Sequence, residues 1–193
     1  IPQADSSTKQ GKWEKSKFNG TEINGKYLGL IGCGNIGSIV ASRALGLKMK
    51  VLAFDPFLTQ EKASELGVEK VNLDYLLSNS DIISLHTPLT EDTKNIISSE
   101  AISVMKKGSR IINCARGGLV DEVACRAALE TGHLAGAAFD VFTEEPAKEN
   151  ILFDAPNFVA TPHLGAATIE AQENVAIQIA QQMSDYLNTG AVV

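Results

Sequence analysis

The chain has 193 residues and a mass of 20.6 kDa, with 44% hydrophobic residues, 21% charged residues and a formal net charge of -6. These values predict one folded domain and argue against extended disorder, a membrane span and general binding to nucleic acid phosphates. Three scattered cysteines, Cys33, Cys114 and Cys125, indicate free thiols in a reducing compartment, so we expect a cytoplasmic protein without a metal site.

The first 25 residues are polar and rich in lysine, and we expect them to form an N-terminal arm of helix and loop. From Lys26 onward, short apolar runs alternate with segments of helical spacing. This pattern predicts strands at 27–31, 51–54, 70–71, 82–85, 110–113, 136–140 and 158–161, and helices at 36–47, 59–66, 73–77, 99–105, 122–130 and 169–187. The predicted fold class is α/β, a doubly wound parallel sheet with both faces covered, in which ligands bind at the carboxyl ends of the strands.

The first predicted strand ends in the loop Gly32-Cys33-Gly34-Asn35-Ile36-Gly37, which has the form G-x-G-x-x-G. Placed between a strand and a helix, this pattern is typical of a Rossmann-like dinucleotide-binding domain. Gly32 permits the tight turn, Gly34 lets the backbone approach a pyrophosphate, and Gly37 lets helix and strand pack closely. We expect the amides near Asn35 and Ile36 to point at the phosphates, and the alternative is a plain glycine turn.

Asp55 follows the second predicted strand, where a carboxylate accepts hydrogen bonds from the adenosine ribose and repels a 2′-phosphate. This placement favours NAD over NADP, and the alternative is a turn aspartate before Pro56. A second glycine segment, 20–26, has the spacing of a phosphate-binding P-loop. It lacks the following Ser or Thr and precedes the strand, so we reject that interpretation.

Polar side chains follow three later strands. His163 follows the last strand and is a candidate acid/base. Arg116 lies among small residues after the fifth strand and suits bidentate binding of a carboxylate, unless it forms a structural salt bridge. Asp140 and Glu145 follow the sixth strand, and we expect one of these acids to orient His163.

Further motifs occur in a fixed order at 11–13, 80–90, 113–122, 140–146 and 162–166, together with the glycine loop and Asp55-Pro56. In this order they resemble the NAD-dependent D-2-hydroxyacid dehydrogenases. The resemblance implies that Arg116, Glu145 and His163 are catalytic, with Glu145 chosen over Glu144 because it directly precedes the proline. It also implies that Asp140 lies near the nicotinamide carboxamide. The implied cofactor contacts outside the glycine loop are Asp55, Thr87, Pro88, Cys114, Ala115, Arg116, Asp140, His163, Gly165 and Ala166.

The implied function is hydride transfer between NAD and C2 of a 2-hydroxy acid. We expect 3-phosphoglycerate, in serine biosynthesis, with glyoxylate or hydroxypyruvate as the alternative. The family's substrate domain is built from chain on both sides of the cofactor domain, and this sequence starts at Ile1 without a methionine. We therefore expect residues 1–193 to be the cofactor domain without its substrate domain. The alternatives are an NAD-binding module without turnover and a corepressor-like relative in which NAD regulates protein association.

Members of the family pair through their cofactor domains, and the sequence offers an anchor for such a pair. Trp13 stands in the polar arm with Phe18 nearby, outside the α/β pattern. Because tryptophan is enriched at interfaces, we expect a homodimer anchored by Trp13, with Lys15 and Lys17 near the partner's cleft. The alternative is that Trp13 packs on its own domain.

Overall fold

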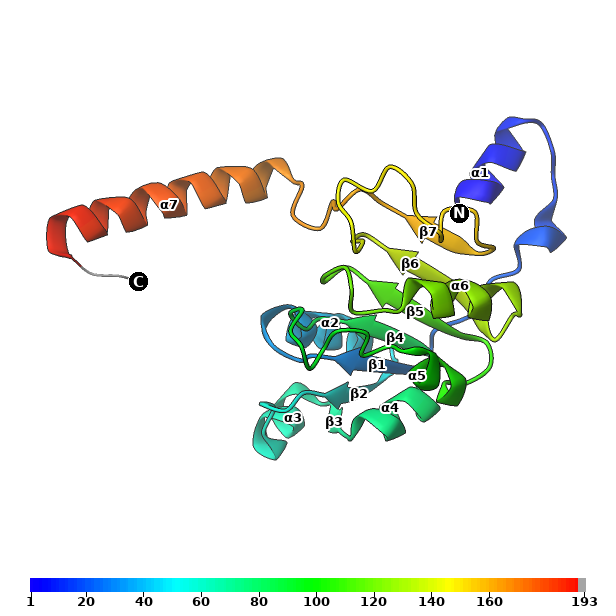
Figure 1. Ribbon diagram of the computed structural model, residues 1–193, viewed down its shortest axis with the longest axis horizontal. Coiled ribbons are helices and arrows are strands. Elements are labelled where there is room, and N and C mark those ends of the chain that lie inside the picture. Colours follow the sequence, from blue (N-terminus) through cyan, green and yellow to red (C-terminus); the bar gives the residue numbers. More distant parts are fainter. Residues whose placement is uncertain (191–193) are drawn as a thin grey trace.

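Seven parallel strands form one sheet, in the order β3-β2-β1-β4-β5-β6-β7, in the computed structural model, which describes residues 1–190 (Figure 1). The strands are β1 (Tyr27–Ile31), β2 (Lys50–Phe54), β3 (Glu69–Lys70), β4 (Ile82–Leu85), β5 (Ser109–Asn113), β6 (Leu134–Phe139) and β7 (Phe158–Ala160). The predicted doubly wound α/β fold is therefore confirmed, and each strand lies within two residues of its predicted bounds.

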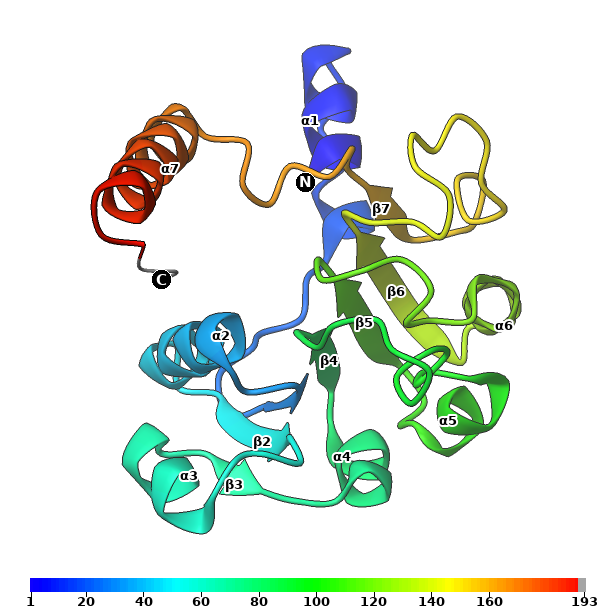
Figure 2. The same ribbon diagram turned by 60° about the vertical axis from the view of Figure 1, so that its left-hand side comes forward.

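The helices of the described chain are α1 (Pro2–Lys9), α2 (Asn35–Gly46), α3 (Gln60–Leu66), α4 (Leu73–Asn79), α5 (Ser99–Val104), α6 (Glu122–Glu130) and α7 (Ile169–Thr189), with a 3-10 turn η1 (Lys15–Phe18). Helices α2 and α3 lie on one side of the sheet, and α4, α5 and α6 lie on the other (Figure 2). Among residues 1–190, no helix is both long and apolar enough to span a bilayer.

The core divides into two apolar layers because neighbouring residues of a strand face opposite sides of the sheet. Leu28 and Leu30 of β1 pack in a buried cluster with Ala41 of α2. Ile31 of the same strand belongs to the other cluster, which includes Cys125 of α6. Helices on both sides of the sheet thus fix β1 at its centre, directly before the glycine loop.

The chain reverses its direction across the sheet at β1. It runs outward through β2 and β3, then returns to place β4 on the other side of β1. In doubly wound sheets, ligands bind at the carboxyl edge beside such a reversal. The glycine loop follows β1 at this point, so the fold places it where a ligand is expected.

The prediction that both faces of the sheet are covered is wrong at the β7 edge. Val159 is 48% exposed and Ala160 is also exposed. The helix that follows, α7, extends away from the sheet, and none of its residues is buried (Figure 1). The run 158–161 is apolar enough to indicate a buried strand, but α7, the helix that follows, does not return to cover it.

The N-terminal arm is helical, as expected, and consists of α1, η1 and their connections. Trp13, between the two, is 87% exposed. The alternative in which Trp13 packs on its own domain is therefore not what the structure shows.

Candidate active site

The three glycines of the loop after β1 have different surroundings. A Cβ on Gly32, whose φ is +92°, would lie 2.5 Å from the carbonyl oxygen of His86, and one on Gly37 would lie 2.3 Å from the Gly32 carbonyl oxygen. Side chains there would collide with backbone, so these two glycines permit close packing of β1, β4 and α2. Gly34 has nothing within 4 Å of the Cβ position. The open space at Gly34 leaves room for a ligand against the backbone.

Helix α2 begins in a way that leaves its first amides available. Its N-cap is Gly34, which supplies no side-chain hydrogen bond. Helices α3 to α7 all begin with a side-chain cap, from Thr59, Asn72, Ser98, Asp121 and Thr168 in turn. The first amides of a helix lack partners within the helix, and its N-terminus attracts anions. The uncapped start of α2 therefore suits a phosphate group.

Asp55, just beyond β2, holds the glycine loop in place. Its Oδ2 accepts a hydrogen bond of 2.8 Å from the Cys33 amide, and its Oδ1 accepts one of 2.8 Å from the Phe57 amide. Each carboxylate oxygen can accept a further hydrogen bond. Asp55 can thus hold the loop and still accept from the hydroxyl groups of a ribose.

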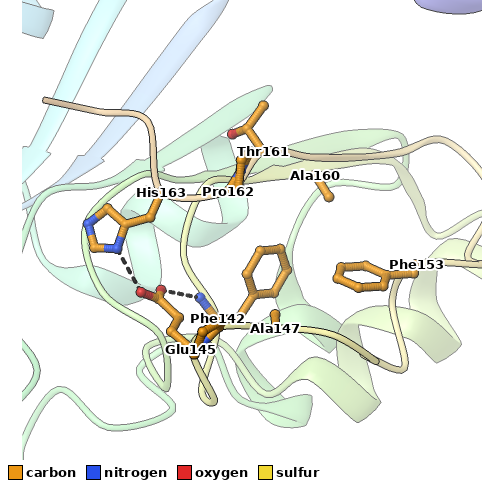
Figure 3. Close-up of a pocket in the computed structure, with 9 residues that line it drawn as sticks. Phe142, Glu145, Ala147, Phe153, Ala160, Thr161, Pro162 and His163 are labelled. Carbon is orange, nitrogen blue, oxygen red and sulfur yellow. Dashed lines mark hydrogen bonds and ion pairs between the residues drawn. The ribbon is translucent and has the colours of Figure 1, made fainter. Parts of the chain in front are cut away.

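His163 and Glu145 form a hydrogen-bonded pair at the same edge of the sheet (Figure 3). His163 Nδ1 lies 2.7 Å from Glu145 Oε2, and Glu145 Oε1 accepts a hydrogen bond of 2.9 Å from the Phe142 amide. The hydrogen bond with His163, followed by that from Phe142, holds the pKa of the Glu145 carboxyl below its ordinary value. An ionised carboxylate only accepts, so Glu145 can accept a hydrogen bond from Nδ1–H, and Nε2 is then the ring nitrogen open to a further partner.

The His163 turn is held by the buried side chain of Asp140, at the end of β6. Asp140 Oδ1 accepts from Thr161 Oγ1 at 2.5 Å and from the Leu164 amide at 2.8 Å, and Oδ2 accepts from the Gly165 amide at 2.8 Å. The His163 amide donates to the Asp140 carbonyl at 2.9 Å. These bonds stabilise His163 in a left-handed conformation, with φ of +54°.

The charge state of Asp140 follows from these contacts. Burial acts to raise the pKa of its carboxyl, but the hydrogen bonds from Thr161, Leu164 and Gly165 outweigh burial and hold the pKa below its ordinary value. The resemblance implied a contact between Asp140 and the nicotinamide. In the structure, both oxygens of this carboxylate bond the turn that carries His163.

Arg116 is presented by a short turn after β5. Asn113, which is 1% exposed, accepts from the Ala115 amide at 3.1 Å and donates to the Arg116 carbonyl at 2.9 Å. Arg116 Nη1 donates to the Ala115 carbonyl at 2.6 Å, and no carboxylate of residues 1–190 lies within 4.0 Å of the Arg116 guanidinium. The alternative of a structural salt bridge is therefore not seen, and the charge is available to a ligand.

Two supports of the site were missed by the sequence analysis. Asn113 is one, and its position directly before a glycine-rich turn was the available signal, because asparagine side chains stabilise turns. The other is Gly117, where a Cβ would lie only 1.8 Å from the Phe142 carbonyl oxygen. The Arg116 turn and the loop that carries Glu145 are thus in direct backbone contact, which no sequence pattern indicates.

The remaining predicted contacts lie along the same edge. Thr87 follows β4 against the glycine loop, with its amide nitrogen 3.0 Å from the Cβ position of Gly32. The Pro88 carbonyl accepts from Thr93 Oγ1 at 2.7 Å. Cys114 is exposed after β5, and Ala166 is exposed in the segment before α7.

A mainly apolar pocket of about 300 Å³ lies beside the His163–Glu145 pair (Figure 3). Phe142 and Phe153 meet edge to face in its wall, with ring centroids 5.5 Å apart. The other lining residues are Glu145, Pro146, Ala147, Ala160, Thr161, Pro162 and His163. The His163–Glu145 pair thus lies between the open edge of the sheet and an apolar hollow.

Comparison with known proteins identifies this arrangement. Residues 1–165 match the model of the D-isomer specific 2-hydroxyacid dehydrogenase, NAD binding domain. The chain belongs to this family. The D-3-phosphoglycerate dehydrogenase of Bacillus subtilis (strain 168) is 50% identical over 186 residues, which are 96% of this chain and 35% of that protein. The chain thus spans about a third of the length of the curated relatives that it matches first.

Two solved structures share the fold. A glyoxylate reductase from Paecilomyes thermophila has a TM-score of 0.90 at 33% identity, covering 98% of this chain and 57% of that one. A D-lactate dehydrogenase from Aquifex aeolicus, complexed with NAD and lactic acid, has a TM-score of 0.86 at 31% identity, covering 96% and 61%.

The cofactor of this dehydrogenase family is NAD, and the residues of the chain fit it. The open backbone at Gly34 and the uncapped α2 suit a pyrophosphate, and Asp55 retains acceptor capacity for a ribose. Within residues 1–190, there is no cluster of side chains that could hold a metal ion.

Proposed function

We propose that this domain binds NAD and supplies the catalytic pair for hydride transfer to and from C2 of a 2-hydroxy acid. The 2.7 Å contact between His163 and Glu145 is the observation that carries the proposal. It lies at the same edge of the sheet as the glycine loop, so one molecule can meet both. The bound cofactor would supply the hydride acceptor, NAD⁺, for oxidation and the hydride donor, NADH, for reduction.

The residues of the chain have separate roles in this proposal. His163 Nε2 takes the hydroxyl proton in oxidation and returns it in reduction. Glu145, bonded at Nδ1, orients the ring and stabilises the imidazolium that forms. Arg116 binds the substrate carboxylate and polarises the carbon–oxygen bond, because its guanidinium has no carboxylate partner in the described chain.

We propose D-3-phosphoglycerate as the substrate, in a serine-biosynthetic role in the cytoplasm. The support is the name shared by the curated relatives, which are about half identical to this chain. A glyoxylate or hydroxypyruvate reductase is the second candidate, supported by the fold shared with a glyoxylate reductase at 33% identity.

We further propose that residues 1–193 work together with a substrate-binding domain. The support lies in the exposure of the catalytic pair, whose side chains are 52% (His163) and 35% (Glu145) accessible. Hydride and proton transfer are favoured in a site closed to water, which requires a second wall. A homodimer anchored by the exposed Trp13 completes the proposal.

Calorimetric titration with NADH and NADPH tests cofactor binding directly. We expect the chain to bind NADH more tightly than NADPH, because the Asp55 carboxylate repels a 2′-phosphate. Asp55→Ala should weaken NADH binding by about 1–3 kcal/mol, the scale of a lost charged hydrogen bond. Asp74→Ala, which removes an exposed carboxylate on α4, is the control and should leave binding unchanged. Equal affinity for NADH and NADPH would contradict the assignment of Asp55.

A further inference from the structure

We propose that Glu122, the first residue of α6, is a positioning residue that holds Glu145 against His163. The inference rests on the proposed role of the Glu145–His163 pair. Glu122 lies outside every set of residues proposed above to touch cofactor or substrate. It acts on the acid loop, which we define as residues 141–150.

Glu122 accepts hydrogen bonds from the acid loop at two points. Its Oε1 accepts hydrogen bonds from the Thr143 amide at 3.1 Å and from Thr143 Oγ1 at 3.0 Å. Its Oε2 accepts one of 2.7 Å from Asn150 Nδ2. Glu145 lies between these two anchors in the chain, so the half-buried Glu122 carboxylate fixes both sides of the segment that carries it.

The anchor at Thr143 is next to the amide that orients Glu145. The Phe142 amide donates to Glu145 Oε1, while Glu145 Oε2 bonds His163. If Thr143 moves, the Phe142 amide moves with it, and Glu145 loses one of its two fixed partners. Glu122 therefore acts on His163 through the backbone of Phe142 and one carboxylate.

A carboxylate is the group that this position requires. All three of its partners are donors, and an ionised carboxylate is the side chain that only accepts. Asn150 cannot turn its amide around without loss, because its Oδ1 accepts from the Leu152 amide at 2.8 Å. An amide at position 122 would thus direct a donor at the Asn150 donor. The negative charge is itself favoured at the start of α6.

Glu122 is not required as the cap of α6. Asp121 caps this helix by accepting from the Ala124 amide at 3.0 Å. Arg126, one turn later on the same helix, donates to the Ile151 carbonyl directly after the acid loop. Helix α6 thus bonds the acid loop through Glu122 and the residue directly after the loop through Arg126, and Glu122 bonds the part nearest Glu145.

The test uses NMR on the original chain and four variants. The reporters are the hydrogen exchange rate of the Phe142 amide and the ring nitrogen signals of His163, which respond to the Glu145 hydrogen bond. Glu122→Gln should speed exchange at Phe142 and shift the His163 signals, while the buried Ile111 amide of β5 stays protected. Glu149→Gln changes an exposed carboxylate of the same loop and should move neither reporter.

The double variant Glu122→Gln with Asn150→Asp provides the rescue. It exchanges donor and acceptor, so the new amide donates to the new carboxylate and the net charge of the pair is unchanged. Both reporters should return toward the original values. Asn150→Asp alone places two carboxylates together and should disturb both reporters more than Glu122→Gln does.

Several results would overturn the inference. One is an unchanged Phe142 rate and unchanged His163 signals in Glu122→Gln, and another is a parallel rise at Phe142 and Ile111, which would indicate only a loss of global stability. If Glu122→Gln does not fold, Thr143→Val removes one donor and should move the same reporters by a smaller amount, and no movement would also overturn it. These readouts do not depend on turnover, so failure of the proposed activity would be seen separately.

Discussion

At the scale of single residues, the site depends on the glycines of the loop after β1, which have no side chain. Gly32 and Gly37 are required by neighbouring backbone, whereas Gly34 has open space at its Cβ position and a φ outside the left-handed region. Glycines that look alike in the sequence therefore have different functions. Gly32 and Gly37 serve the fold, and the space at Gly34 is available to a ligand.

This difference predicts the behaviour of Gly34→Ala. The variant should fold with an unchanged midpoint of thermal unfolding, because its methyl group meets no atom of the chain. It should bind NADH more weakly, because the methyl group occupies the space that the phosphates need. Gly46→Ala is the matched control, since its Cβ also meets nothing and it lies at the other end of α2. Tight NADH binding by Gly34→Ala would show that the loop is only a structural turn.

At the scale of elements, the turn between β7 and α7 depends on one buried carboxylate. Asp140 holds this turn through three side-chain hydrogen bonds, and its pKa lies below the ordinary value. A carboxyl with a lowered pKa stabilises the fold above its unfolded pKa, about 3.9, and this contribution is lost as pH falls through the folded pKa. Acid should therefore loosen the His163 turn.

We expect Asp140→Asn to lower the free energy of unfolding at pH 7 by about 1–3 kcal/mol, because an amide cannot accept from all three donors. Between about pH 4 and pH 2, the free energy of the variant should fall less steeply than that of the original chain. Urea unfolding curves measured across this range provide the comparison. Parallel curves for the two proteins would mean that Asp140 does not contribute the acid sensitivity.

The elements were predictable from the sequence because their signals are local. The continuous apolar strands, the G-x-G-x-x-G loop and the helical spacing at 122–130 each depend on neighbouring residues. The supports of the site were not predictable in this way. Glu122 and Thr143 are 21 residues apart, and the contact of Gly117 with Phe142 joins two loops, so both arise only when β5 and β6 pair. The exposed β7 edge was missed because apolar composition does not report which helix covers a strand.

At the scale of the whole molecule, the homodimer proposed above rests on one exposed aromatic residue. Trp13 is 87% exposed on the arm. Light scattering on the chain should give about twice the 20.6 kDa of one chain, and Trp13→Ala should shift the distribution toward monomer. Phe57→Ala, which removes another highly exposed aromatic residue, away from the arm, should leave the mass unchanged. A single-chain mass at micromolar concentration for the original protein would contradict the proposal.

The exposure of the proposed catalytic pair should limit catalysis by this chain alone. We expect negligible oxidation of 3-phosphoglycerate by this chain alone, although Arg116, Glu145 and His163 are all present. The reason is that the side chains of His163 and Glu145 are accessible to water. The rate of this oxidation is measured from the absorbance of the NADH that forms. Steady turnover at about 1 per second or faster, the range of ordinary enzymes, would show that no second wall is needed.

Helix α7 begins after the turn that Asp140 holds and extends away from the sheet, so a small rotation at its start is amplified along its length. A helix of 21 residues is about 30 Å long, and nothing in the described chain buries it. A rotation of about 10° at its base therefore moves its far end by about 5 Å, from the geometry of a rigid rod. The turn next to His163 is fixed by hydrogen bonds to Asp140, whereas the helix beyond it does not pack on the domain. A surface that binds the far end of α7 would therefore fix the direction of the whole helix relative to the sheet.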